Sequence, residues 1–546
     1  MKTTRLITAL AAVILVSAVG AGSAYGHAER LSYYPNHKLG SVPKYKRSGP
    51  ALVVCKSDSG SRIRRLLSGK AKRRNLALLE RCRYRDIQAA VDAAHNGTRI
   101  LVLPGVYREE PSRRVAEPAE ACSVDYQEYQ DPHFEGVGTV RVPNFDYQRK
   151  CPNAQNLIAI VGDGPDKDRR CDHKCNIQIE GTGTKPSHVL IDGSRKKLNV
   201  IRADRADGIH LRNFTVQFSD FNNIYVLETN GFRMENIVSR WSREYGFLSF
   251  TSDNGLYRKL TAYGSGDSGI YPGSGPEGHC RRYGIEVDRV DSYGNNIGWS
   301  GTAGNGIYTH DSKFHGNSAG ITTDSFAGGH PGMPQDCSKW ERNEIYSNNL
   351  DLFSEERDQY CFEKNRPIQE RDPKVVCPAF PVPVGTGLLI AGGNRNIIRN
   401  NRIWGNWRAG VMQFWVPSSF RGTDPTGQSK NYGPAYEAQT DTSNGNRMLG
   451  NAMGMTPRGV RAPNGVDFWW DEEGHRNCWS ENRARAGSAI TSDPLRLPGC
   501  PGSAVHHDIN PAKLAALAPC GTWDPQDDVL QDPPGCDWFT APRKPR

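Results

Sequence analysis

The sequence has little that would hold it in a membrane or around a copper ion. Beyond the first 26 of its 546 residues, no apolar run is long enough to cross a bilayer. Its seven methionines are scattered, so the clustered soft ligands of a copper-delivery protein are missing. Aromatic residues make up only 9% of the chain and hydrophobic residues 37%, whereas 57 glycines are present. This composition is typical of a globular, turn-rich chain rather than a disordered one.

The N-terminus predicts export. Lys2 and Arg5 precede the apolar run "LITALAAVILVSAV", and "AGSAYG" offers small residues for cleavage after Ala24 or Gly26. We interpret residues 1–26 as a signal peptide; an uncleaved membrane anchor is the alternative, although the run is short for one. No cysteine follows the run directly, which argues against a lipid anchor. We expect a secreted or cell-wall-associated protein with no stable membrane insertion after cleavage.

The cysteine count fits an oxidising compartment. Fourteen cysteines, an even number, can pair completely in an exported chain. Proximity in the sequence suggests three local bridges: Cys55–Cys82, Cys280–Cys337 and Cys361–Cys377. Cys171 and Cys175 have a spacing that also suits a metal, but in an exported chain we favour a disulfide role.

Positive charge is concentrated near the N-terminus. Residues 44–85 contain fourteen Lys/Arg and two acidic residues, an excess larger than the net charge of +10 of the whole chain. This stretch can form a basic helix that binds an anionic polymer, or it can be a solvated surface. We expect an anionic polysaccharide as the partner, no nucleic acid, and a monomeric protein.

Rows of about 22 residues repeat through the middle of the chain. They begin with "GIHLRNFTVQFS" at Gly208, "GFRMENIVSRWS" at Gly231, "NGLYRKLTAYGS" at Asn254, "GIEVDRVDSYGN" at Gly284 and "GIYTHDSKFHGN" at Gly306. Apolar residues alternate in each row with one two-residue break, which predicts two short strands joined by a bend. A third strand, such as "NIYVLET" or "GITTDSF", closes each row. Three short strands per turn predict an all-β fold, a single-stranded right-handed parallel β-helix whose stacked rows share one core.

The ends of the rows and of the repeat region are also informative. Asparagine or a small residue ends each row ("YGS", "YGN", "HGN", "YSN", "WGN"), so we expect tight turns and stacked side-chain ladders there. Before the repeats, "IQAAVDAA" predicts an amphipathic helix that caps the first coil and covers its strand edges. The predicted parts are a signal peptide (1–26), a basic segment (27–83), the β-helix (84–486) with disulfide-rich loops (274–282, 326–337, 351–384), and a Pro/Cys-rich extension (487–546).

The capping stretch carries a family resemblance. "IQAAVDAAHNGTRILVLPGVYREE" resembles the N-terminal cap of the pectin-lyase-like superfamily of secreted parallel β-helices, and "PGVYREE" is similar to the Gly-x-Tyr-x-Glu start of pectinesterases. The rows from Asp267 onward are similar to β-helix repeats of the NosD-like type. The resemblance implies the fold and a carbohydrate-related role. The catalytic motifs of pectinesterases, polygalacturonases and pectate lyases are absent, so no catalytic residue is carried over.

Loops 274–282 and 326–337 leave the same edge of nearby turns, where a rigid scaffold can hold a site. If Ile224, Phe247, Ile270, Ile297 and Ile321 face inward, the intervening residues of the third strands face outward. The candidate catalytic residues are Asp324, His330, Glu277 and Arg281, and the candidate substrate-binding residues are Tyr271, Tyr225, Phe250, His279 and Asp336. Aromatic rings beside a carboxylate suit sugar binding; alternatively, the loops cover these rings as a second small core.

The candidate residues allow two kinds of reaction. Two carboxylates can hydrolyse a glycosidic bond. A lyase or epimerase instead removes the proton next to a uronate carboxylate, which needs a base such as His330 and a cation, either Arg281 or a Ca²⁺ cofactor. We therefore predict a lyase, epimerase or glycoside hydrolase acting on an anionic polysaccharide. The alternative is a non-catalytic surface protein that binds a cell-wall or matrix polymer.

Overall fold

The computed structural model describes Arg30 and residues 32–109, 126–130, 139–162, 168–325, 330–362, 370–379, 381–418, 440–484, 486–522 and 532–546. The predicted signal peptide lies outside the described residues. Among the described helices, none is both long enough and apolar enough to pass through a bilayer.

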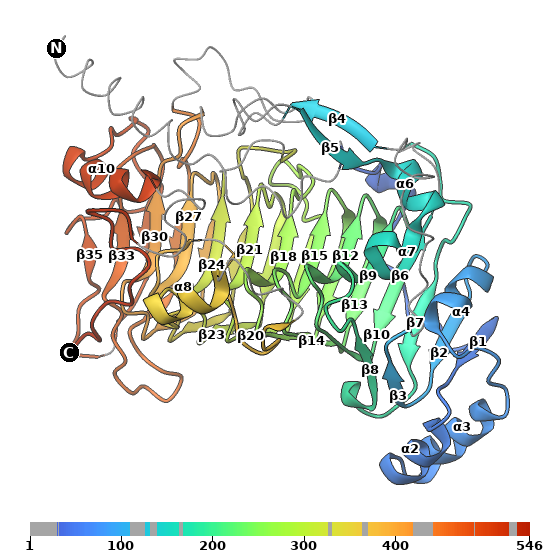
Figure 1. The fold of residues 1–546 in the computed structure, drawn as a ribbon. Coiled ribbons are helices and arrows are strands. Elements are labelled where there is room, and N and C mark those ends of the chain that lie inside the picture. Colours follow the sequence, from blue (N-terminus) through green and yellow to red (C-terminus); the bar gives the residue numbers. More distant parts are fainter. Residues whose placement is uncertain are drawn as a thin grey trace.

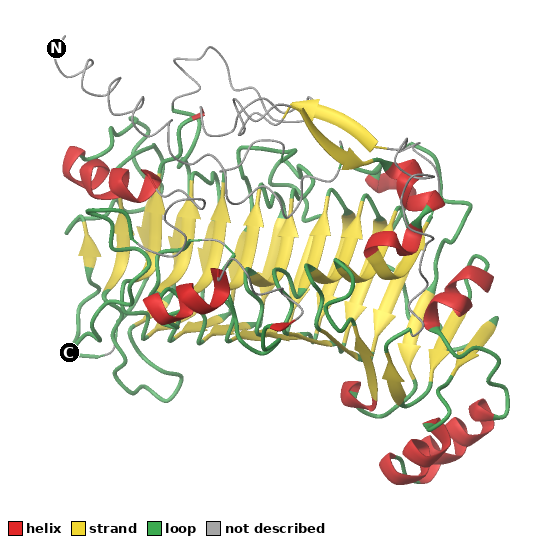
Figure 2. Cartoon of the chain, in the orientation of Figure 1, coloured by secondary structure: helices red, strands yellow, loops and turns green. Residues whose placement is uncertain are grey.

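Three parallel sheets run side by side along the whole repeat region (Figure 1, Figure 2). We call them the first, second and third sheets, in the order in which each coil visits them. The first sheet consists of β1 (Ala51–Val54), β2 (Arg99–Val102), β7 (Gln178–Gly181), β10 (Ile209–Arg212), β13 (Asn230–Glu235), β16 (Asp253–Arg258), β19 (Ile285–Asp288), β22 (Ile307–His310), β25 (Lys339–Glu341), β28 (Ile397–Arg399), β31 (Arg447–Leu449) and β34 (Cys478–Ser480).

The other two sheets have the same order of coils. The second sheet consists of β3 (Gly105–Tyr107), β8 (Val189–Asp192), β11 (Thr215–Gln217), β14 (Val238–Arg240), β17 (Thr261–Tyr263), β20 (Asp291–Tyr293), β23 (Lys313–His315), β26 (Glu344–Tyr346), β29 (Arg402–Trp404) and β32 (Ala452–Met453). The third consists of β6 (Asn156–Val161), β9 (Asn199–Asp204), β12 (Asn222–Leu227), β15 (Phe247–Phe250), β18 (Ser268–Gly273), β21 (Ile297–Thr302), β24 (Ala319–Asp324), β27 (Thr386–Ala391), β30 (Ala409–Phe414), β33 (Val466–Trp470) and β35 (Ser492–Asp493). The predicted parallel β-helix is confirmed.

One continuous apolar core fills the space between the sheets, as expected for stacked coils that cannot bury their own faces alone. The predicted register is wrong at one step. Ile270 pairs with Trp299 rather than with Ile297, and Ile297 packs in a separate apolar cluster with Val384 and Phe539. The fully buried Trp299 fills the core edge-to-face against Trp340, with ring centroids 5.4 Å apart. Gly298, expected to face outward, instead lies against the core, where a Cβ atom would stand 3.3 Å from Phe314 Cδ1, whereas Ser300 faces outward beside Thr322 as expected.

Asparagine ladders stack at the corner between the second and third sheets, as the row ends predicted. Along this corner each side-chain amide donates to the side-chain oxygen of the asparagine one coil further on, at 3.0–3.2 Å. The ladder contains Asn295, Asn317, Asn348, Asn406 and Asn464. All five are buried, so the ladder satisfies polar groups that would otherwise be costly inside the fold.

The predicted capping helix is α4 (Ile87–Ala93), which covers the first coil (Figure 1). Its residues Ile87, Ala90 and Val91 are buried in the core. The carboxylate of Glu109 accepts from the first main-chain N–H groups of α4, Ile87 at 2.9 Å and Gln88 at 3.2 Å, and so caps the helix. The basic stretch forms two helices, α2 (Ser59–Leu66) and α3 (Gly69–Leu79), whose apolar sides pack on β1 and β2.

An N-terminal strap, consisting of Arg30 and residues 32–50, lies along the edge between the third and first sheets. The side-chain amide of Asn230 donates to its backbone at Asn36 O (2.7 Å). Arg30 is buried and donates to Asp204 at 2.8 Å and to Glu228 at 2.5 Å. Burial alone would raise the pKa of Asp204, but Arg30 and neighbouring arginines hold it well below its usual range. The strap is therefore fixed by charges as well as by backbone contacts.

The remaining elements lie outside the coils or at their C-terminal end. They are the antiparallel pair β4 (Tyr126–Gln130) and β5 (Thr139–Pro143), the helices α6 (Phe145–Lys150), α7 (Pro152–Gln155), α8 (Glu355–Phe362) and α10 (Pro511–Leu517), and the 3₁₀ turns η2 (His37–Leu39), η3 (Pro186–His188) and η6 (Ala518–Thr522). Disulfides join Cys55–Cys82, Cys171–Cys175, Cys280–Cys337, Cys361–Cys377, Cys478–Cys500 and Cys520–Cys536. The three predicted local bridges and the disulfide role of Cys171 and Cys175 are confirmed.

Candidate functional site

Two loops leave the third sheet on turns that are two coils apart and are fastened to each other. One follows β18 and the other follows β24, and the Cys280–Cys337 disulfide joins them. Between them, the Asn305 side-chain amide donates to Gly275 O at 3.2 Å and to Gly332 O at 2.7 Å. Tyr34 of the N-terminal strap donates its hydroxyl to Pro331 O at 2.9 Å. The edge of the third sheet that the sequence predicted as a candidate site thus carries two loops held together by a disulfide and by hydrogen bonds.

A glycine allows one tyrosine to lie along the outer face of the third sheet. Tyr271 and Gly273 point to the same face of β18 because they are two residues apart. A Cβ atom on Gly273 would stand 1.8 Å from the Tyr271 Cε1 atom, so the ring occupies the space above the glycine. Burial raises the pKa of Tyr271 well above its usual value, and the charge of Asp324 raises it further. The Tyr271 hydroxyl is therefore protonated and can donate a hydrogen bond.

Asp324 ends β24 next to this ring. In the parallel register Asp324 pairs with Thr302 of β21, whose hydroxyl donates to Asp324 Oδ2 at 3.0 Å. The adjacent outward pair, Thr322 and Ser300, is joined by a hydroxyl hydrogen bond of 3.1 Å. Asp324 is half-buried whereas Tyr271 is buried, so the carboxylate is the more accessible member of the pair. The outer face carries a proton-accepting and a proton-donating group on a hydroxyl-lined floor.

His330 and the predicted aromatic platform belong to the same face. The His330 ring, only 5% exposed, packs edge-to-face on Phe250 with ring centroids 5.4 Å apart. The rings of Tyr225, Phe250 and Tyr271 form a buried cluster with Leu227, Tyr245 and Leu248. These buried rings form a second small core. The sequence left this arrangement open as the alternative to rings that stack on a sugar. His330 thus contacts Phe250, the charge of Asp324 acts on Tyr271, and Tyr225 belongs to the same ring cluster as Phe250 and Tyr271.

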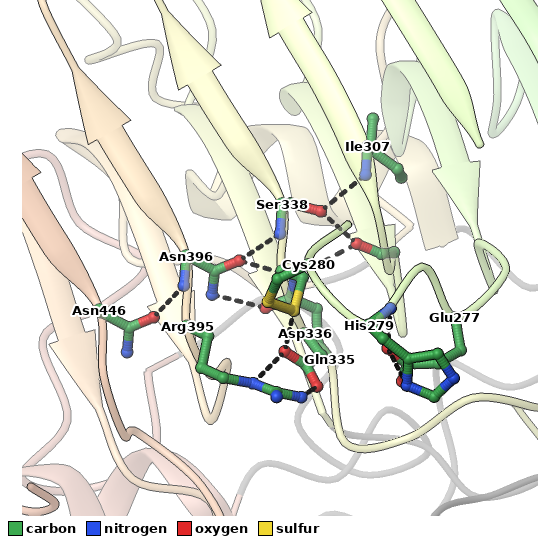
Figure 3. The surroundings of a disulfide bond; sticks show 12 residues. Glu277, His279, Cys280, Ile307, Gln335, Asp336, Ser338, Arg395, Asn396 and Asn446 are labelled. Carbon is green, nitrogen blue, oxygen red and sulfur yellow. Dashed lines mark hydrogen bonds and ion pairs between the residues drawn. A yellow bond between two sulfur atoms is a disulfide. The ribbon is translucent and has the colours of Figure 1, made fainter. Parts of the chain in front are cut away.

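The other predicted residues gather around the Cys280–Cys337 disulfide (Figure 3). Glu277 accepts the main-chain N–H of His279 at 2.8 Å, and the His279 side chain is 78% exposed. Asp336 has no exposed surface, and Arg395 forms a two-pronged ion pair with it (Figure 3). Arg281 is exposed on the first loop. Asp336 thus joins two neighbouring coils electrostatically, which is a structural use of its charge.

Two clusters of three metal-ligating side chains are found among the described residues, and neither suits Ca²⁺. Side chains of Asp288, His310 and Asp311 lie close enough to share an ion, but Arg289 pairs with Asp288 and Arg342 with Asp311. Calcium takes six to eight oxygen ligands, which this arginine-neutralised trio does not provide. The second close group consists of Asp336 and the two cysteines of the disulfide, whose sulfurs are bonded to each other.

A basic groove that the sequence reasoning missed runs along the last coils, beside the same disulfide. It has a volume of about 1130 Å³. Its lining residues are Cys280, Asn394, Arg395, Ile397, Thr440, Asp441, Asn444, Gly445, Arg447, His475, Arg476, Cys500 and Pro501. The signal for it is a short repeated motif: "NRN" at 394–396, "NGN" at 444–446 and "HRN" at 475–477.

The motif builds the groove because its residues stack in register. Asn394 Oδ1 accepts the N–H of Asn444 at 2.9 Å, and Asn444 Oδ1 accepts the N–H of His475 at 3.0 Å. The imidazole Nδ1 of His475 lies 2.7 Å from the same Asn444 oxygen. Burial, assisted by His506 and Arg476, lowers the pKa of His475, which keeps the ring neutral at pH 7. His475 thus takes the place of an asparagine at the end of a ladder.

Comparison with known proteins gives structural likenesses only. No family model matches the chain, and no curated protein matches it. Among solved structures, the mannuronan C-5 epimerase AlgE4 A-module of Azotobacter vinelandii is 11% identical, covering 74% of this chain and 85% of that one, with a TM-score of 0.42. Pectate lyase Pel9A is 13% identical over 84% and 80% (TM-score 0.34), and a rhamnogalacturonan lyase is 9% identical over 71% and 88% (TM-score 0.34). The fold assignment rests on the three parallel sheets themselves.

Proposed function

We propose that this protein is a polysaccharide-modifying enzyme whose reaction takes place on the outer face of the third sheet. The observation that carries the proposal is the pairing of a half-buried carboxylate, Asp324, with the protonated phenol of Tyr271, which a glycine holds in place. Acid–base pairs of this kind contribute roughly 10²–10⁴-fold to the rates of proton-transfer reactions.

The two groups have complementary roles in this proposal. Asp324, held by the Thr302 hydroxyl at 3.0 Å, accepts a proton either from a sugar carbon next to a carboxylate or from an attacking water. Tyr271 donates a proton to the departing glycosidic oxygen in elimination or hydrolysis, or to the opposite face of the same carbon in epimerisation. The hydroxyls of Ser300 and Thr322 line the same face and suit the hydroxyl groups of a sugar chain. The same pair can serve elimination, epimerisation or hydrolysis, so the products decide between these reactions.

The test is a product assay on a panel of acidic and neutral polysaccharides. Reducing ends report cleavage of either kind, ultraviolet absorbance reports unsaturated ends, and proton NMR reports epimerisation. We expect Asp324→Asn and Tyr271→Phe to lower kcat on the active substrate by about 10²-fold or more while KM changes little. Asp291→Asn is the matched control, because Asp291 lies on the second sheet and pairs with His315.

The alternative is a protein that binds a wall or matrix polymer without changing it. The covered state of Tyr271 favours this reading, because a buried hydroxyl does not reach a sugar for proton transfer. Retention on an immobilised polysaccharide without product, in both wild type and the Asp324→Asn variant, would replace the enzymatic proposal by this one.

A further inference from the structure

The outer face of the first sheet balances its charges along most of its length. Arg258 lies 3.2 Å from Asp288, and Arg399 lies 3.7 Å from Glu341. Arg212 similarly contacts Glu180 at 3.4 Å. Paired surface charges of this kind stabilise a fold only slightly and leave little field in the surrounding water. Such a face has no particular attraction for an anion.

At the basic groove, positive side chains are no longer matched by negative ones. Among the described residues, its lining includes three arginines, Arg395, Arg447 and Arg476, against one aspartate, the buried Asp441. Asp336 pairs with Arg395. Within the described part of the chain, Arg447 and Arg476 form no ion pair, and both are exposed. A concave surface lined by unbalanced charge of one sign concentrates oppositely charged ligands.

We infer that the basic groove binds an acidic polysaccharide, with Arg447 and Arg476 holding successive carboxylates. Guanidinium groups bind carboxylates through two parallel hydrogen bonds, which gives orientation as well as affinity. The side chains of Asn394 and Asn444 are already engaged in hydrogen bonds within the groove wall, so the two arginines carry the recognition. The groove lies on the first sheet, so it is a second site that anchors the polymer rather than part of the pair on the third sheet.

The lining favours a polysaccharide over a nucleic acid. Unpaired bases bind by stacking on Phe, Tyr or Trp rings, and none of these residues is among the described residues of the groove lining. The inference rests on the proposed function only in naming a polysaccharide as the polymer; the charge pattern itself is independent of catalysis.

The test measures binding by fluorescence anisotropy with a labelled oligogalacturonate, in the full-length Asp324→Asn background so that turnover does not consume the probe. We expect saturable binding that weakens as salt is raised, because exposed charges are screened. Arg447→Gln combined with Arg476→Gln should weaken it by about tenfold or more. The matched control is Arg458→Gln combined with Arg496→Gln, which removes two exposed arginines outside the groove lining and should stay within about twofold of the parent.

Three results would overturn the inference. They are no binding of the oligogalacturonate, equal weakening by both double variants, and binding as strong for a neutral maltooligosaccharide or a single-stranded oligonucleotide of the same length. The binding assay does not measure product formation, so its result can be interpreted even if the proposed enzymatic function proves wrong. Conversely, loss of groove binding with turnover of short substrates intact would show that the two sites are separate.

Discussion

The geometry of Tyr271 makes a sharp prediction for Gly273→Ala. The new Cβ atom would stand 1.8 Å from Tyr271 Cε1 and 2.8 Å from Cζ, whereas ordinary van der Waals contact begins near 3.4 Å. The ring must therefore move by more than 1 Å, within a cluster where its centroid lies 4.8 Å from that of Tyr245. Overpacking of a tight core costs about 1–3 kcal/mol, so we expect the free energy of unfolding to fall by that amount.

A double-mutant cycle isolates the cause. In a Tyr271→Ala background the ring is absent, and Gly273→Ala should then be neutral or stabilising by up to about 1 kcal/mol, because glycine weakens strand interiors. The coupling energy between the two positions should therefore be about 1–4 kcal/mol, measured by urea unfolding followed through tryptophan fluorescence. Gly499→Ala is the control, since nothing lies within 4 Å of its added Cβ atom. An equal cost of Gly273→Ala in both backgrounds would refute the placement of the ring above the glycine.

Two further predictions concern buried charge. Arg30→Met should lower the free energy of unfolding at pH 7 by about 3 kcal/mol, because it leaves Asp204 and Glu228 without their shared partner. Since the folded pKa of Asp204 is depressed, the difference in stability between wild type and variant should shrink as the pH falls below about 4. An undiminished difference at pH 3 would contradict the reasoning. Burial raises the pKa of Asp267 to about 7, so its folded state holds a proton and stability should decline between about pH 4 and pH 7, by up to about 4 kcal/mol. Asp267→Asn, which can still accept the Tyr245 hydroxyl, should flatten that decline in melting temperatures recorded from pH 4 to pH 8, and an unchanged pH profile would count against it.

The repeat pattern predicts the fold well because each coil must bury the same face. Inward residues such as Phe247 and Ile321, and the asparagine ladder through Asn317, follow from alternation and from the row ends alone. The slip at Trp299 could not be seen, because either Ile297 or Trp299 satisfies the alternation and only packing against Trp340 selects one. Alternation indicates which side chains of a strand face the core, whereas the volumes of the packed side chains select one register among those that bury the same face.

The candidate sites were less visible in the sequence for two different reasons. Tyr271 and Asp324 were found as outward residues, but the role of Gly273 depends on a side-chain direction that a one-dimensional pattern does not contain. The basic groove depends on coils separated by insertions, so Arg447 and Arg476 are 29 positions apart in sequence and become neighbours only when the coils stack. The repeated "NRN", "NGN" and "HRN" motif is the one local trace of that stacking.

The central claim is that a polysaccharide is processed on the outer face of the third sheet. The most direct test is a crystal structure of the Asp324→Asn variant with an oligosaccharide of the substrate that the wild type turns over. We predict sugar density across β18, β21 and β24, with a reacting atom within hydrogen-bond distance of the residue at 324 and of the Tyr271 hydroxyl. An ordered oligosaccharide that lies elsewhere, with the ring cluster around Tyr271 still covered, would contradict the claim.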